Sequence, residues 1–167
     1  MSKIATLHEL YVDELKDLWS ANDQMAKALK KILPKAQNAK LVTHLETAQN
    51  GIATHIELLK SLIDQHGTDV KKEHCKGMEG LVLEAIKHTV DDAPTAGPVL
   101  DAAIIAQYQR MTHYGITGFG TVSAFAKVLK LDADREQLQA AVGKMYSSDE
   151  LMSELAESAV NVDAAEA

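Results

Sequence analysis

Apolar residues recur every three or four positions along four long stretches of the chain, and this periodicity limits the possible folds more than any other feature. The stripes occupy residues 7–32, 41–62, 104–129 and 138–156. A spacing of three and four residues places side chains on one face of a helix. Each stretch is therefore predicted to form an amphipathic helix, and no alternating strand pattern lies between them.

Helix-start and helix-stop signals frame these stripes. Thr6 with Glu9 forms a capping box, Asn38 is a predicted N-cap, and Pro98 suits a first helical turn. Gly67 is a predicted stop. Either Asp132 or Asp134 is expected to open the last helix. The predicted helices cover about residues 6–34, 39–66, 75–91, 98–130 and 134–160, and the tail 161–167 is expected to fray.

The connections predict the topology. Residues 34–40 and 130–134 are short links, which indicate two antiparallel helical hairpins. The link from 67 to 97 is long and holds a short apolar helix of its own. The predicted fold class is therefore all-α, a ferritin-like four-helix bundle of two antiparallel hairpins with a short extra helix in the crossover. A chain of 167 residues suits one such domain, spanning residues 1–167.

Composition excludes several classes of function. The net charge of −7 and the 4% content of aromatic residues disfavour nucleic-acid binding, which needs cationic surface and stacking platforms. The sequence contains no run of 18 apolar residues, so no membrane span is predicted. A secretory leader is not expected either, because no basic segment followed by an apolar stretch lies at the N-terminus. The single cysteine fits a reducing compartment, so a cytoplasmic location is expected. Fingerprints for dinucleotides or phosphate loops are absent.

Some inward positions of the stripes are polar. Asn22, His55 and Asp149 lie on the first, second and fourth stripes, and His113 lies beside the third. Structural interpretations exist for each: a buried Asn can fix helix register, a core His is usually hydrogen-bonded, and a carboxylate can pair with a neighbour.

Glycines open a gap in the third stripe. Gly115, Gly118 and Gly120 each weaken a helix interior by about 1 kcal/mol relative to alanine. This cost predicts close helix approach, or room for a bulky side chain opposite such as Trp19 or Met145.

A metal centre is the alternative interpretation of the polar positions. Ferritin-like di-iron bundles take a Glu from each of two helices and Glu-x-x-His from the other two. This chain offers His55, His113 and Asp149, with the phenols of Tyr11 and Tyr108 as further donors. One carboxylate does not balance two divalent cations in a core of low dielectric constant. The expectation is therefore no cofactor, and the alternative is an altered site for iron or another divalent transition metal at His55, His113 and Asp149.

The chain resembles the YciE/YciF-type ferritin-like family, a bacterial family associated with stress responses. The segments that carry the resemblance are LHELYVDELKDLWSANDQMAKAL (7–29), CKGMEGLV (75–82), DAAIIAQYQRMTHYGITGFGTVSAFA (101–126) and SDELMSELAE (148–157). It covers about residues 6–160. The resemblance implies an all-α ferritin-like bundle, commonly dimeric, with a di-metal centre.

The first two helices depart from the family where carboxylate ligands are implied. The family segment AENQ reads ANDQ here, so Asn22 stands at a glutamate position. Gly51 stands one turn before His55, where the family has glutamate.

The last two helices depart in the same way. The family segment EHYE reads THYG here, so Thr112 and Gly115 replace glutamates on either side of His113. Residues 144–146 read KMY in place of an EEK segment, and Asp149 remains. Loss of about five carboxylates on four helices predicts a site replaced by packing, because unpaired buried charges are costly.

Three hypotheses for function follow. The first is a non-catalytic structural or assembly protein, stress-associated and without an intact di-iron centre. The second is a metal-binding protein with an altered site. The third, a di-iron oxidoreductase or iron store, rests on fold analogy alone. In each case a homo-oligomer is expected, with a dimer built on the helices at 6–34 and 39–66, and no nucleic-acid or membrane partner.

The lone thiol has two interpretations. Cys75 lies beside His74 and Lys76, whose charge could lower its pKa and favour a redox role. The alternative is an unreactive surface or half-buried thiol.

Overall fold

A computed structural model describes residues 4–67 and 73–167, and all the regular structure in these two ranges is helical. The all-α prediction is confirmed. The α-helices are α1 (Leu7–Ile32), α2 (Ala39–Gln65), α3 (Lys76–Ile86), α4 (Pro98–Val128), α5 (Asp132–Leu155) and α6 (Asn161–Glu166). A 3₁₀ turn at Leu33–Lys35 and π-helical turns at Lys87–Asp91 and Ala156–Val160 extend three of them.

The predicted signals account for the starts of α1, α2 and α4 and for the end of α2. Thr6 Oγ1 accepts from the Glu9 amide, and the Glu9 carboxylate accepts from the Thr6 amide at 3.0 Å. Asn38 Oδ1 caps α2, and Pro98 occupies the first turn of α4. Gly67 follows α2 with a φ of 65°, a conformation that glycine adopts without strain.

One further end prediction is confirmed and one is wrong. Asp132 opens α5 as its first residue, and the N-cap before it, Leu131, makes no side-chain cap. Residues 161–166 are helical and not frayed, because Val160 at the end of the preceding π-helical turn is buried and anchors this segment against the core.

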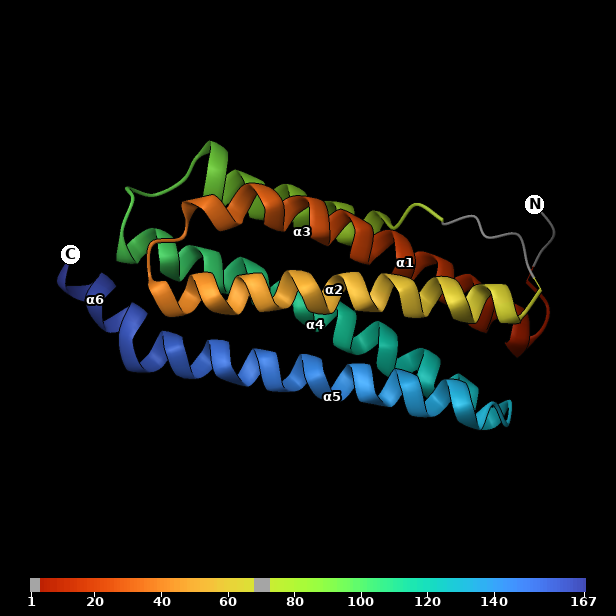
Figure 1. The fold of residues 1–167 in the computed structure, drawn as a ribbon. Coiled ribbons are helices and arrows are strands. Elements are labelled where there is room, and N and C mark those ends of the chain that lie inside the picture. Colours follow the sequence, from red (N-terminus) through yellow and green to blue (C-terminus); the bar gives the residue numbers. More distant parts are fainter. Residues whose placement is uncertain (1–3, 68–72) are drawn as a thin grey trace.

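The four long helices form two antiparallel hairpins, α1 with α2 and α4 with α5 (Figure 1). Helix α3, in the crossover, packs along α1 and α4. Asp101 in the first turn of α4 joins the two hairpins. Its carboxylate accepts from the backbone amides of Gln37 and Asn38, both at 2.8 Å, in the link between α1 and α2.

Two apolar clusters fill the bundle, one at each end. One contains Met25, Leu45 and Ile104 and is covered by α3, and the other contains Leu15, Leu62 and Phe119. No described helix combines the length and the apolar character that a membrane crossing needs.

The packing requires a glycine at two of the three positions of the glycine gap in α4. A Cβ on Gly115 would lie 3.1 Å from Met145 Sδ, which confirms the predicted bulky neighbour. A Cβ on Gly118 would overlap Leu18, so Leu18 and not Trp19 requires this glycine. Gly120 has open space around it, and nothing in the packing requires a glycine there.

Candidate functional site

A cavity of about 650 Å³ separates the two apolar clusters. Its mouth lies between α2 and α5, where small residues such as Ala48, Gly51 and Gly143 leave the space between the helices unfilled. Its inner wall comes from α1, α3 and α4. Because this is the middle of the bundle, the cavity occupies the position at which the resemblance implies a metal centre.

Two polar residues predicted to face inward, Asn22 and His55, line the cavity, and so does Thr112, which stands at a glutamate position of the family. Asn22 Nδ2 donates to the Leu18 carbonyl of its own helix at 2.9 Å, so it does not fix register across helices as one interpretation held. Thr112 is 4% exposed, and among the described residues its Oγ1 has no hydrogen-bond partner. A buried hydroxyl without a partner is unfavourable and uncommon in a native core.

His55 packs its ring on Phe119, with the ring centroids 5.1 Å apart. Burial, assisted by the positive charge of Lys144, lowers the pKa of His55 to about 4. The imidazole is therefore neutral at physiological pH and offers one donor and one acceptor to its surroundings.

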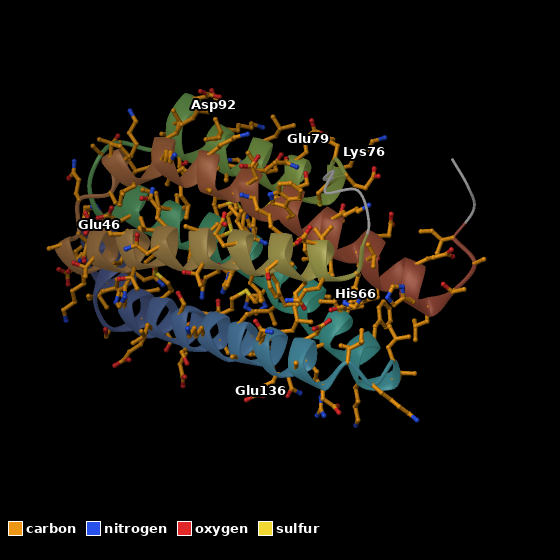
Figure 2. All side chains as sticks on the ribbon, turned by 45° about the vertical axis from the view of Figure 1, so that its right-hand side comes forward. Glu46, His66, Lys76, Glu79, Asp92 and Glu136 are labelled. Carbon is orange, nitrogen blue, oxygen red and sulfur yellow. The ribbon has the colours of Figure 1, made fainter. Side chains whose placement is uncertain are left out.

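The described wall of the cavity contains no acidic side chains. Of the described residues that line it, none is Asp or Glu, whereas Lys144 and His44 do line it. Glu136 shows the usual placement, on the outer side of α5 and away from the other helices (Figure 2). The positions at which the resemblance implies glutamates, Gly51 and Gly115 among them, contribute no negative charge to the wall.

The predicted trio His55, His113 and Asp149 does not converge. His113 Nε2 lies 2.8 Å from Asp149 Oδ2, and Gln109 Nε2 donates to Asp149 Oδ1 at 3.1 Å. The His113 side chain is 57% exposed, and neither it nor Asp149 lines the cavity that holds His55. The expected inward position of Asp149 is therefore wrong, because Met145 and Met152 fill the buried face of α5 on either side of it.

Potential metal donors are dispersed in the same way elsewhere. Within residues 4–67 and 73–167, no three His, Cys, Asp or Glu side chains group closely enough to hold a metal ion. Tyr108 lines the cavity and bonds Ser148 Oγ at 2.9 Å, whereas Tyr11 lies outside it.

Sequence reasoning missed a polar cluster at the end of the bundle. Tyr11 donates to Asp134 Oδ2 at 3.0 Å, His66 Nε2 lies 2.8 Å from the same oxygen, and His8 Nε2 lies 3.0 Å from His66 Nδ1. Figure 2 shows His66 at the end of α2. Burial and then the Asp134 carboxylate raise the pKa of the Tyr11 hydroxyl. No local motif marks this cluster, since its hydrogen-bonded pairs lie up to 123 positions apart.

Cys75 is a buried N-cap and not an activated thiol. It is 1% exposed, its Sγ accepts from the Met78 amide and lies 2.9 Å from Tyr114 Oη, and Tyr114 also donates to Asp17. Burial raises the pKa of the Cys75 thiol. Of the two interpretations, the unreactive thiol is supported and the lowering of the pKa by His74 and Lys76 is wrong, because burial has the largest effect on the thiol and His74 is 3.1 Å from Glu79.

Cys75 is therefore expected to react with Ellman's reagent at least about a hundredfold more slowly in the native chain than in urea, since only the exposed thiolate attacks. A chain with Cys75→Ser and Ser158→Cys provides the control, because Ser158 is exposed and its replacement should react at the unfolded rate. Equal native rates for the two thiols would contradict the buried position.

The geometry defines an all-helical protein with an interior cavity, and the comparisons identify its class. The chain matches the family profile described as "Domain of unknown function (DUF892)" over residues 6–165, and it belongs to that family. The predicted membership of the YciE/YciF-type family is confirmed by similarity to "Protein YciF" of Escherichia coli (strain K12). That relative is 29% identical over an alignment of 160 residues, and the match covers 93% of each chain.

Two solved structures share the fold. The crystal structure of the E. coli stress protein YciF has a TM-score of 0.86 at 27% identity, and the match covers 95% of this chain and 99% of that one. YcfI from Rhodopseudomonas palustris, described as a candidate structural protein, has a TM-score of 0.84 at 28% identity, with coverage of 90% and 95%.

Proposed function

We propose that this chain is a non-catalytic structural or assembly protein, associated with stress and built on a ferritin-like bundle that has no intact di-iron centre. The cavity wall carries this proposal. Asn22, Gly51 and Gly115 line the cavity where the resemblance implies glutamates, and Lys144 adds a positive charge. Two divalent cations in such a wall would have no carboxylates to neutralise them, and the uncompensated charge would be strongly unfavourable.

The topology and the relatives support the same function. Two antiparallel hairpins joined by one long crossover are typical of ferritin-like bundles. YciF is described as a stress protein and YcfI as a candidate structural protein, so the two names agree with a structural role under stress. The proposal includes a cytoplasmic homo-oligomer, a dimer or larger, because the single thiol suits a reducing compartment and the family commonly pairs.

An altered transition-metal site is the second candidate. The His113–Asp149 contact at 2.8 Å favours it, since an imidazole and a carboxylate already meet there. His55 would not join this pair without a rearrangement, so any such site would have few protein ligands.

Elemental mass spectrometry on protein purified without tag metals or chelators tests both candidates. We expect less than about 0.1 iron per chain, because no carboxylate set is present to hold two ions. Light scattering on the same sample is expected to report a dimer or a larger assembly.

Two iron ions per chain would overturn the proposal and restore the oxidoreductase or storage hypothesis. About one transition metal per chain, lost in the His55→Ala/His113→Ala double variant, would establish the altered site instead.

A further inference from the structure

The cavity is larger than a packing defect. Its volume of about 650 Å³ falls in the range of small-molecule sites, typically about 300–1,000 Å³. Cores of proteins normally contain few voids larger than a water molecule. The cavity also opens to solvent between α2 and α5, so a ligand can enter without unfolding the bundle.

Methionine dominates the apolar wall. Four of the six methionines of the chain line the cavity, namely Met25, Met78, Met111 and Met145. The thioether side chain is flexible and polarisable, and it adapts to apolar groups of varied shape. This lining suits an apolar ligand body without demanding one shape.

A positive charge at the mouth of the cavity selects the polar end of the ligand. At the mouth, Lys144 is exposed and positively charged, and no described lining residue is acidic. In a chain with a net charge of −7, this local absence of carboxylates favours an anion over a cation.

We propose that the cavity binds a small amphipathic carboxylate, with its apolar body against the methionines and its carboxylate group at the mouth. Lys144 attracts the anion at the mouth. The inference goes beyond the proposed function and rests on it in one respect, that no di-metal centre fills the same space.

The probe is sodium decanoate, added to the full chain labelled with ¹³C at the methionine methyl groups. The four cavity methionines are expected to shift on binding, whereas Met152, which is buried but does not line the cavity, is expected to stay unchanged. Decylammonium, which has the same chain length and the opposite charge, is expected to bind at least about tenfold more weakly.

Gly51→Leu is the decisive variant. A Cβ at Gly51 meets no atom within 4 Å, so the leucine can occupy the cavity, and leucine also favours the helix over glycine. Decanoate binding should weaken at least about tenfold with no loss of stability. Gly80→Leu is the matched control, since Gly80 is an exposed helical glycine with equal space outside the cavity. It should leave binding unchanged.

A further variant tests the charge at the mouth. Lys144→Gln should weaken decanoate binding about threefold and remove its dependence on salt.

The proposal is overturned if decanoate leaves the cavity methyl groups unshifted, if it binds Gly51→Leu as tightly as the parent chain, or if decylammonium binds equally well. Failure of decanoate to bind would leave the proposed structural function standing. Two iron ions per chain, by contrast, would overturn that function whatever decanoate does.

Discussion

Asp134→Ala is expected to lower the free energy of unfolding by about 3 kcal/mol, the largest effect of any single substitution considered. The Asp134 carboxylate accepts a hydrogen bond from Tyr11, which is 0% exposed, and contacts His66 at 2.8 Å. Alanine would leave the buried Tyr11 hydroxyl without its acceptor. It would also release the end of α2 from the start of α5. Urea unfolding followed by circular dichroism measures the loss.

Asp132→Ala is the matched control for this prediction. Asp132 also lies in the first turn of α5, but it is exposed. Its removal should lose only the favourable interaction with the helix N-terminus, about 0.5 kcal/mol. Asp134→Asn keeps one acceptor and is expected to lose about half as much as Asp134→Ala. Equal losses for the two alanine variants would show that first-turn charge, and not the buried contact, accounts for the effect.

The helices were predictable because their determinants are local. Periodicity depends on neighbours three and four positions away, and the capping box at Thr6 and Glu9 spans four residues. The same signals predicted the two short hairpin links and the helix in the crossover. The helical tail at 161–166 was missed because its stability comes from the packing of Val160 against the core and not from its own sequence.

The candidate site was predictable only in part, because inward and lateral positions differ by a small rotation. One residue turns a helix by about 100°, so a stripe drawn through every third or fourth residue also collects residues at its border. His55 lies at the centre of its stripe and lines the cavity. Asp149 lies at the border and turns toward His113 on the neighbouring helix.

Contacts between distant segments left no local signal at all. The burial of Cys75 depends on Ser20, which accepts from its amide at 3.0 Å, and on Tyr114, 39 positions away. The cationic neighbours of Cys75 in the sequence pointed to the opposite pKa shift. The cavity is likewise a property of five helices at once, so its volume and its unpartnered hydroxyl could be found only in three dimensions.

His55 is expected to make the protein less stable as the pH falls from about 6.5 to about 4. Burial, with help from Lys144, lowers the pKa of His55 from 6.5 to about 4. Between these values the unfolded chain binds a proton at this site and the folded chain does not. Acid therefore favours unfolding in this window, and the contribution of His55 is constant above it. Between pH 7 and pH 5 the expected loss is about 2 kcal/mol.

A double comparison isolates this contribution. The free energy of unfolding is measured at both pH values for the parent chain and for His55→Gln, and the variant should lose about 2 kcal/mol less across the interval. The other titratable groups that line the cavity, His44, Tyr108 and Lys144, are present in both chains and cancel. The ¹³C shift of the His55 ring gives its pKa directly. A midpoint near 6.5 would mean that water or an anion solvates the imidazole, and the cavity would then be more polar than its methionine lining implies.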